Sequence, residues 1–322
     1  MYDIIGDIHG CAPQLKDQLN QLGYRHDEDG VYRHPERTVV FVGDLIDRGA
    51  HQLEVLQIVK AMVDAGSAKI VMGNHEFNAI AYAKGLREHS AKNTKQHKAF
   101  LDQLTPAEQR YFVEWFTTLP LWLDLGGIRV VHACWHKDSM KAVVEECGSD
   151  RLTDEQHYVD ATTEGSPLYA AVETLLKGPE ISLTKYGADP YWDKDHHMRT
   201  YARIRWWDHD ASTLRDLAET RGALTENGLP YPELADRAID SPVDRSYVYT
   251  DKVPLFYGHY WRQWEPVHRD DWTTYTACVD FSAVKGGTLV AYRWNGEPEI
   301  KWENYIPHDP SIVSPTPADR TV

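Results

Sequence analysis

The sequence is short of basic residues and has no long apolar run. Its 322 residues include 34 Lys and Arg against 49 Asp and Glu, which gives a net charge of −15. No run of five or more basic residues occurs. Phosphate backbones are bound through clusters of Lys and Arg, so we expect no nucleic-acid polymer as a partner. No segment approaches the roughly 18 apolar residues of a membrane-spanning helix, so we expect no contact with a membrane.

Cysteine is scarce as well. The chain has four cysteines, widely spaced and without a CxxC pair. This pattern is typical of reduced thiols rather than of a disulfide framework. The first residues, MYDII, read as a strand, without the basic region and long apolar segment of a signal peptide. The sequence therefore predicts a soluble, cytoplasmic protein. Its 42% hydrophobic and 11% aromatic residues are typical of a globular chain.

Short apolar runs alternate with helical patterns in the first third of the chain. Strands are expected at 2–5, 39–42 and 69–72, each followed by a stretch with helical character. Such alternation predicts βαβ units and a sheet that is at least partly parallel. Two segments with a Gly-Gly pair, 121–133 and 275–294, are expected to form hairpins.

Residues 136–250 differ from the rest. They are rich in Asp, Glu, Pro and aromatic residues and have weak periodicity. We expect a substrate-facing insertion that covers one edge of the core, with helices at 211–222 and 232–239. Residues 1–306 would form a single domain. Residues 307–322 hold four prolines and few apolar residues, which predicts a flexible C-terminal tail.

Five of the expected strands end in residues that can bind metal ions. These residues are Asp7 and His9, Asp44, Asn74 and His75, His132, and His259. Strand ends at one edge of such a sheet form the usual ligand crevice, so we expect them to meet. A single His or Asp at a strand end is more often a cap or a turn former, whereas five together indicate a metal site. Oxygen and nitrogen ligands without thiolate suit manganese, iron, zinc or cobalt.

The motifs GDIHG, GDLIDRG, GNHE, VHA and GH, in this order, resemble those of the calcineurin-like metallophosphoesterases. The DRG and GNHE forms are most similar to the phosphoprotein-phosphatase branch and to the related diadenosine tetraphosphatases. The resemblance covers about residues 1–135 and 253–295. It implies an α/β fold, a four-layer α/β/β/α sandwich of two mixed β-sheets, with a dimetal site at the C-terminal ends of the strands.

The resemblance also implies a role for each matching residue. The ligands of two divalent ions, manganese first and iron, zinc or cobalt as alternatives, would be Asp7, His9, Asp44, Asn74, His132 and His259, with Asp44 bridging the two ions. Arg48 would bind the phosphoryl oxygens. His75 would protonate the leaving oxygen or stabilise the transition state, with Asp47 orienting it.

Physical chemistry supports this arrangement independently. Two cations roughly 3.5–4 Å apart acidify a bridging water and stabilise both the attacking and the leaving oxygen. The planar fork of Arg48 matches the geometry of a phosphate group. The stretch ARIRWWDH offers a second arginine for a phosphate contact, either Arg203 or Arg205, and we choose Arg205 as the candidate. An arginine stacked on a surface tryptophan is an equal alternative.

The chain also departs from the family pattern. Gly258-His259-Tyr260-Trp261 lacks the last His of the common GHxH motif, which favours the phosphoprotein-phosphatase branch. Asp280-Phe281-Ser282 stands where relatives tend to carry Asp-Thr-Gly. The usual glycines after VH are also replaced, by Ala133, Cys134 and Trp135. Because this change and the one at Asp280-Phe281-Ser282 touch the rim of the site, the substrate of a relative cannot be transferred to this chain.

We therefore expect a metal-dependent phosphatase that hydrolyses phosphomonoesters in the manner of a protein phosphatase, by in-line attack of a hydroxide held between two metals. The alternative is a hydrolase of dinucleoside polyphosphates or other nucleotides, so the partner is a phosphopeptide or a nucleotide. The aromatic middle segment suits either. An inactive phosphate-binding module is disfavoured, because such a module has no need to retain the whole ligand set.

Overall fold

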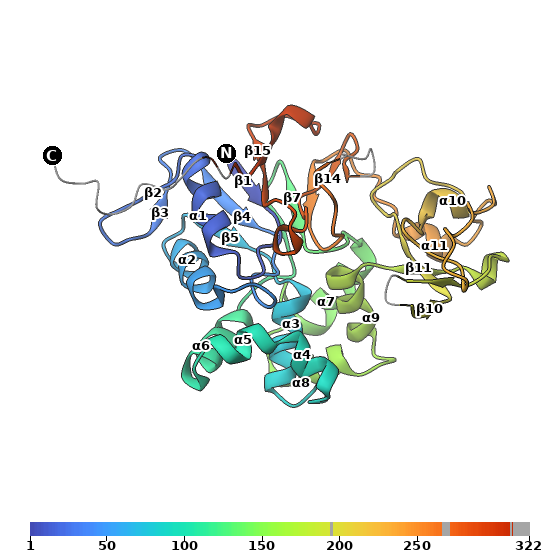
Figure 1. The fold of residues 1–322 in the computed structure, drawn as a ribbon, viewed down its shortest axis with the longest axis horizontal. Helices are drawn as coiled ribbons and strands as arrows, with labels where there is room; N and C mark the ends of the chain where they lie inside the picture. The colour runs from blue at the N-terminus through green and yellow to red at the C-terminus, as the bar shows by residue number, and fades with distance from the viewer. Residues whose placement is uncertain (194–195, 266–270, 310, 312–322) are drawn as a thin grey trace.

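The computed structural model describes residues 1–193, 196–265, 271–309 and 311 (Figure 1). Two mixed β-sheets carry the fold. The first sheet has five strands in the order β16 (Tyr305–Pro307), β15 (Val290–Trp294), β1 (Tyr2–Ile5), β4 (Thr38–Phe41) and β5 (Ala68–Ile70). Strands β1, β4 and β5 run parallel, whereas β15 pairs antiparallel with both β1 and β16.

The second sheet has four strands in the order β14 (Thr276–Cys278), β13 (Leu255–Tyr257), β7 (Arg129–Val131) and β6 (Trp122–Asp124). Strands β7, β13 and β14 run parallel, and β6 pairs antiparallel with β7. The hairpin predicted at 121–133 is therefore confirmed.

Side chains from the two sheets share one apolar cluster. Ile4 and Val40 from the first sheet belong to it together with Val130 and Phe256 from the second. Successive strand residues point to opposite faces. Ile5 and the other strand residues that point to the opposite face accordingly belong to a larger cluster, which also contains buried side chains of the helices. Strands buried on both faces read as continuous apolar runs, which is how they appear in the sequence.

The helices of the first half are α1 (Ala12–Gln21), α2 (Gln52–Asp64), α3 (Asn74–Ala83), α4 (Ala91–Gln96), α5 (Lys98–Gln103) and α6 (Pro106–Phe116). Helices α7 (Lys137–Cys147), α8 (Glu155–Thr162) and α9 (Pro167–Lys177) follow β7. A separate hairpin pairs β2 (Arg25–His26) with β3 (Tyr32–Arg33). Among the described residues, no helix is long and apolar enough to cross a membrane.

After α9 the chain builds small elements at one end of the molecule (Figure 1). A three-stranded sheet joins β8 (Glu180–Ser182), β11 (Tyr201–Ile204) and β12 (Ala218–Glu219), and β9 (Tyr191–Trp192) pairs with β10 (Met198–Arg199). The two helices are α10 (Leu214–Leu217) and α11 (Pro242–Ser246), and short 3₁₀ turns lie at Thr184–Tyr186, Ala283–Lys285 and Trp302–Asn304.

Both helix predictions in this segment are wrong. The helix predicted at 211–222 is much shorter than expected, and the helix predicted at 232–239 does not form. Only α10, four residues long, forms in the first range, and the second contains no helix. The backbone N–H of Leu214 donates to the carbonyl of Arg237, and that of Ile239 donates to the carbonyl of Ser212. These two bonds form an isolated antiparallel bridge between Thr213 and Ala238, so the second segment pairs with the residue that caps α10 and forms no helix of its own.

The hairpin predicted at 275–294 is also wrong, because its two strands lie in different sheets. Strand β14 pairs with β13, whereas β15 pairs with β1 and β16. The Gly-Gly pair follows the 3₁₀ turn Ala283–Lys285 within a longer crossover. Of the tail predicted at 307–322, Pro307 belongs to β16 and the N–H of His308 donates to Leu289. Residues 310 and 312–322 of the tail lie outside the described residues.

Candidate active site

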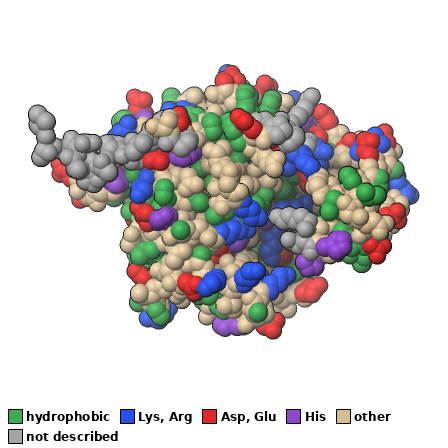
Figure 2. Space-filling view, in the orientation of Figure 1, with side chains coloured by type: hydrophobic (Ala, Val, Ile, Leu, Met, Phe, Trp, Pro, Cys, Tyr) green, Lys and Arg blue, Asp and Glu red, His purple; other side chains and the backbone are tan. Residues whose placement is uncertain are grey.

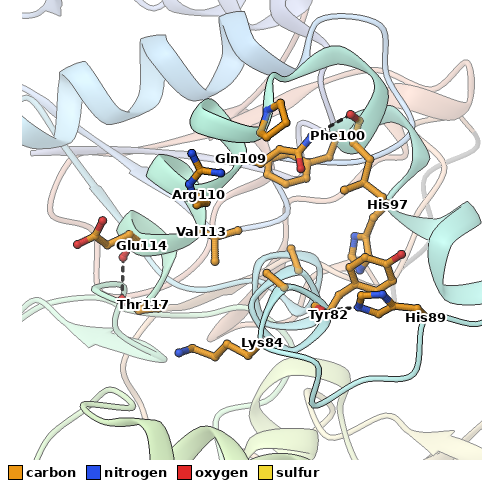
Figure 3. Close-up of a pocket in the computed structure, with 14 residues that line it drawn as sticks. Tyr82, Lys84, His89, His97, Phe100, Gln109, Arg110, Val113, Glu114 and Thr117 are labelled. Atoms are coloured by element: carbon orange, nitrogen blue, oxygen red, sulfur yellow. Dashed lines mark hydrogen bonds between the residues drawn. The ribbon is translucent and has the colours of Figure 1, made fainter.

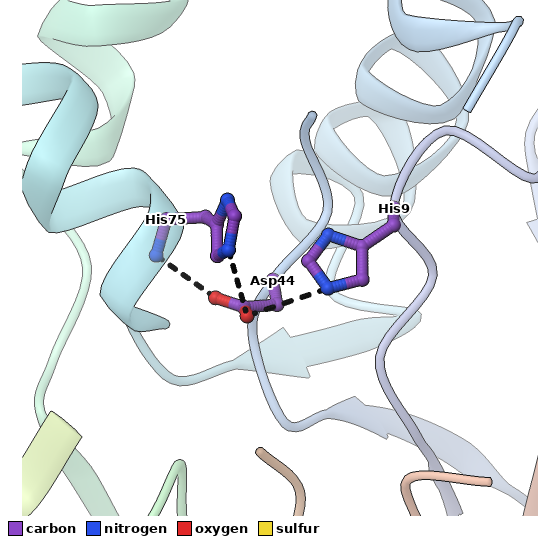
Figure 4. A group of neighbouring side chains, drawn as sticks. All are labelled: His9, Asp44 and His75. Atoms are coloured by element: carbon purple, nitrogen blue, oxygen red, sulfur yellow. Dashed lines mark hydrogen bonds and ion pairs between the residues drawn. The ribbon is translucent and has the colours of Figure 1, made fainter. Parts of the chain in front are cut away.

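The predicted ligands gather around one carboxylate, that of Asp44. Parallel strands present their carboxyl ends at the same edge, and Asp44 comes shortly after β4 at that edge. Its carboxylate lies 3.5 Å from Nε2 of His9, 3.9 Å from Nε2 of His75 and 3.5 Å from Nε2 of His132. Figure 4 shows His9 and His75 approaching it from two different segments. All four side chains are buried.

The other predicted ligands complete the cluster. The amide oxygen of Asn74 lies 3.1 Å from Nε2 of His132 and 2.9 Å from Nδ1 of His259. Asp7 accepts a hydrogen bond of 3.1 Å from the backbone N–H of His259. Asp44, His132 and His259 offer ligand atoms within 4.8 Å of one another, and so do His9, Asp44 and His75. The structure thus brings all six predicted ligands together.

Backbone carbonyls orient two of these histidines. Nδ1 of His9 lies 2.7 Å from the carbonyl of Ile46, and Nδ1 of His132 lies 2.7 Å from the carbonyl of Val42. A carbonyl only accepts, so each Nδ1 carries the proton and each Nε2 keeps its lone pair. Both lone pairs face the Asp44 cluster, as in a histidine prepared to bind a metal.

The loops that carry the site adopt unusual backbone conformations. His9, Asp44, Asp47, Arg48 and His259 all have positive φ angles, between 46° and 73°. Such angles are uncommon outside glycine and cluster at functional sites, where the surrounding structure must hold them. Each of these five residues also belongs to one of the motifs.

Glu76 holds two of these loops, and the sequence analysis assigned it no role. Its buried carboxylate accepts hydrogen bonds from the N–H groups of Asp44 at 2.8 Å, Leu45 at 2.8 Å and Gly73 at 3.0 Å. Gly73 also needs its hydrogen side chain, because a Cβ there would lie 2.3 Å from Asp44. The final Glu of GNHE was the available signal, since an acid in the first turn of a helix commonly binds nearby N–H groups.

His75 and Asp47 form the expected pair, and His97 joins them. Nδ1 of His75 lies 2.5 Å from Oδ2 of Asp47, and Nδ1 of His97 lies 2.9 Å from the same oxygen. All three are buried. Burial alone lowers the pKa of His75, but the charges of Asp44 and Asp47 raise it more, so its net pKa lies above the usual value. His97 lies between α4 and α5, where no sequence motif marks it.

Arg48 lies at the wall of the site. Its guanidinium contacts Nε2 of His9, and Nη2 lies 3.2 Å from Nε2 of His75. The guanidinium also stacks on Trp261, 4.0 Å from the ring centroid, and Lys285 lies 3.2 Å from the same centroid. These contacts hold the planar fork beside the ligand cluster.

Asp280 lies at a sixth strand end of the site, just beyond β14. Its buried carboxylate accepts from the N–H of Trp261 and from the N–H of Ser282, both at 2.9 Å. It therefore positions the loop that stacks on Arg48. The family-like position of Asp280 was visible in the sequence, but its contact with Trp261 was not.

A cavity of about 720 Å³ opens onto the ligand cluster. Its lining includes one carboxylate, that of Asp44, and seven cationic side chains: Arg48, Arg87, Lys92, Lys95, Lys177, Arg203 and Lys285. Figure 2 shows Lys and Arg side chains gathered at the middle of this face. In a chain of net charge −15, this concentration of positive charge makes the cavity a candidate anion-binding site.

Arg205 is not among the residues that line this cavity, whereas Arg203 is. The guanidinium of Arg205 lies 4.0 Å from Asp208. The adjacent Trp206 and Trp207 are fully buried rather than on the surface. Of the two candidate arginines, the structure thus places Arg203 of β11 at the wall of this cavity.

A second cavity of about 540 Å³ lies among α3, α5 and α6 (Figure 3). Its walls are largely apolar, with Phe100 and Val113 among them, and the rings of Tyr82 and His89 stack at 3.9 Å. His97 connects this cavity to the Asp47–His75 pair. None of the predicted metal ligands lines it, whereas Asp44, Asn74 and His259 line the first cavity.

The donor set fits divalent cations. Oδ1 of Asp7 and Nε2 of His259 are buried without a hydrogen-bond partner among the described residues. Burial raises the pKa of Asp7, and the nearby carboxylates of Asp280 and Asp44 raise it further. Bound cations would relieve this repulsion and satisfy the unpartnered atoms.

Known proteins share these motifs. The family profile described as calcineurin-like phosphoesterase matches residues 2–259. An asymmetrical bis(5′-nucleosyl)-tetraphosphatase of Bacillus mycoides is 33% identical over 251 residues, which cover 74% of this chain and 94% of the relative. A symmetrical bis(5′-nucleosyl)-tetraphosphatase of Janthinobacterium sp. is 36% identical over 246 residues, which cover 72% of this chain and 76% of the relative.

Other relatives match over shorter segments. An asymmetrical bis(5′-nucleosyl)-tetraphosphatase of Bacillus velezensis is 37% identical over 139 residues, which cover 41% of this chain. The match spans 55% of that relative's length. The crystal structure of a putative diadenosine tetraphosphatase aligns with 96% of this chain and 94% of its own, at 18% identity and a TM-score of 0.44.

Proposed function

This chain belongs to the calcineurin-like phosphoesterase family, and we propose that it is a metal-dependent hydrolase of nucleoside polyphosphates, with dinucleoside tetraphosphates as the first candidates. The sequence alone favoured a protein phosphatase-like activity on phosphomonoesters. The names of the curated relatives support the nucleotide alternative better.

The cationic cavity is the observation that carries this proposal. Seven cationic side chains and one carboxylate line it. A phosphomonoester presents one phosphate group, for which the guanidinium fork of Arg48 is sufficient. A polyphosphate chain presents several adjacent negative charges, which a wall of this composition would neutralise.

The proposal includes the metal centre and the four-layer α/β/β/α arrangement. Asp7, His9, Asp44, Asn74, His132 and His259 would hold two divalent ions, for which manganese is the first choice. When bound, such ions supply a nucleophile from water at neutral pH and stabilise charge on the attacking and leaving oxygens.

The remaining steps belong to the protein's own side chains. Arg48 would bind the oxygens of the attacked phosphoryl group and orient it for in-line displacement. Asp47 accepts from Nδ1 of His75, which leaves Nε2 of His75 beside Arg48. As the bond from phosphorus to the leaving oxygen breaks, His75 would donate its Nε2 proton to that oxygen.

Residues from the middle segment would contribute to substrate binding. Lys177 and Arg203, both within 136–250, line the cavity. This supports the proposal that residues 1–306 form one catalytic domain in which 136–250 faces the substrate.

Hydrolysis of three substrates side by side tests the function. The metal-stripped protein, reconstituted with Mn²⁺, would be offered para-nitrophenyl phosphate, a phosphoserine peptide and diadenosine tetraphosphate. We expect kcat/KM to be at least about a hundredfold higher for the dinucleotide, or roughly 2.7 kcal/mol of transition-state discrimination. The reverse preference would restore the protein phosphatase reading, and no turnover of any substrate would favour a phosphate-binding module.

His97 offers a separate test of the His75 role. Replacement His97→Phe keeps a ring but removes the donor to Asp47, so His75 is held less firmly. The leaving oxygen of phenyl phosphate needs a proton more than that of para-nitrophenyl phosphate does. We therefore expect kcat for phenyl phosphate to fall about tenfold more than kcat for para-nitrophenyl phosphate. This difference is a fraction of the roughly 10²–10⁴-fold that general acids supply. The control is Tyr82→Phe in the same cavity, and equal losses for both substrates would reduce His97 to a structural role.

A further inference from the structure

Three of the cavity's cations come from a short stretch that none of the family motifs includes. Arg87, Lys92 and Lys95 lie between the end of α3 and the start of α5, and all three line the cavity of the ligand cluster. Arg48, by contrast, lies against His9 and His75. The cavity therefore has one arginine at the reacting centre and a second basic group on the wall formed by α4.

Local structure directs this second group to one side. The hydroxyl of Ser90 accepts from the N–H of Asn93 at 3.3 Å and caps α4. Lys92 and Lys95 are three positions apart, so they project from the same side of the helix. Nη2 of Arg87 donates to Oε1 of Gln96 at 2.9 Å, which holds the guanidinium against the same helix.

Among the described residues, no carboxylate forms an ion pair with any member of this group. Lys92 and Lys95 form no ion pair within the described parts of the chain, whereas Lys98, just beyond α4, pairs with Asp102. Nη1 of Arg87 is buried and has no hydrogen-bond partner among the described residues. Like charges on one wall repel each other, and an unsatisfied buried donor costs free energy. A bound anion would remove both costs.

We propose that Arg87, Lys92 and Lys95 bind the phosphate groups of the substrate that are not attacked, so that the site selects chains of at least three phosphates. That the phosphate chain belongs to a nucleotide rests on the proposed function, whereas the preference for a long phosphate chain does not. The reacting phosphate lies at Arg48, and the following phosphates extend along α4. The fork of Arg87 binds one phosphate in a defined geometry, while the lysines act as point charges.

The double variant Lys92→Ala/Lys95→Ala tests the subsite. We expect its loss of kcat/KM with diadenosine tetraphosphate to be at least tenfold greater than its loss with para-nitrophenyl phosphate. The matched control is Lys98→Ala/Lys141→Ala, which removes the same charge outside the cavity and should affect both substrates by the same factor. Equal losses with both substrates in the cavity variant, or a control that discriminates as strongly, would overturn the proposal.

A binding measurement separates this proposal from the proposed function. Titration calorimetry would compare orthophosphate with bis-methylene triphosphate, a non-hydrolysable triphosphate chain, on metal-free and manganese-loaded protein. We expect the native protein to bind the triphosphate more tightly than orthophosphate. In the Lys92→Ala/Lys95→Ala variant, the ratio of these two affinities should fall at least tenfold. If the preference is lost while nucleotides are not cleaved, the subsite stands and the nucleotide function fails. If nucleotides are cleaved and the preference is unchanged, the subsite fails alone.

Discussion

Replacement of Asp44 by asparagine is expected to lower kcat/KM by about 10³-fold or more, which corresponds to roughly 4 kcal/mol of transition-state stabilisation. The carboxylate of Asp44 faces His9, His75 and His132 at 3.5–3.9 Å. It belongs to both groups of potential metal ligands at this site, the one with His9 and His75 and the one with His132 and His259. Asparagine keeps the shape but removes the negative charge, so both positions lose a ligand that attracts cations.

The measurement pairs turnover with metal content. Each protein would be loaded with Mn²⁺, gel-filtered and assayed for bound metal and for hydrolysis, and we expect bound metal per chain to fall together with activity. Asp102→Asn, an identical change on exposed α5, is the control and should behave as the native protein. Retention of more than a tenth of the activity with full metal content would contradict the assignment of Asp44.

Replacement of Arg262 by alanine is expected to lower the free energy of unfolding by about 3–5 kcal/mol. Arg262 is 5% exposed and lies 3.3 Å from Glu219 on β12 and 3.3 Å from the fully buried Asp271. Its guanidinium also stacks 4.7 Å from the ring centroid of Trp207. Removing it takes one cation away from each of these two carboxylates and weakens the junction between β12 and the core.

Urea denaturation followed by circular dichroism would measure this loss. Arg151→Ala, which breaks a surface pair with Asp150, is the control and should cost under about 1 kcal/mol. Burial raises the pKa of Glu219, but Arg262 and its neighbours lower it more, so the net pKa is below its usual value. The pair thus stabilises the protein at neutral pH and loses this contribution as the pH falls through that lowered pKa. The difference in the free energy of unfolding between native protein and Arg262→Ala should therefore become smaller in acid. A difference independent of pH would contradict the ion-pair account.

Much of the site was predictable because its signals are local. Asp7, Asp44 and His132 each follow an apolar strand, and parallel strands bring their carboxyl ends to one edge whatever the connections between them. The pairing of Asp47 with His75 and the proximity of Arg48 followed from the family motifs. The hairpin at 121–133 was predictable because its two strands are adjacent in the chain and joined by a Gly-Gly turn.

The contacts of the supporting residues were not predictable, since they are distant in sequence, although the GNHE motif marked Glu76 itself as a residue able to bind N–H groups. His97 reaches Asp47 across 50 positions, and Glu76 binds the N–H groups of a loop 31 and 32 positions away. The strands at 276–278 and 290–294 were assigned to one hairpin because they are neighbours in the chain. Each has a better partner elsewhere, β13 for the first and β1 for the second.

The sequence by itself determined the ligand types, the order of the motifs and the edge at which they meet, because these depend on short-range patterns. Only the tertiary structure decided where the charges gather. A net charge of −15 argues against binding polyanions, yet seven cations surround one cavity. Net charge is a sum over the whole chain, whereas a substrate responds to the side chains that folding places within a few ångströms of it.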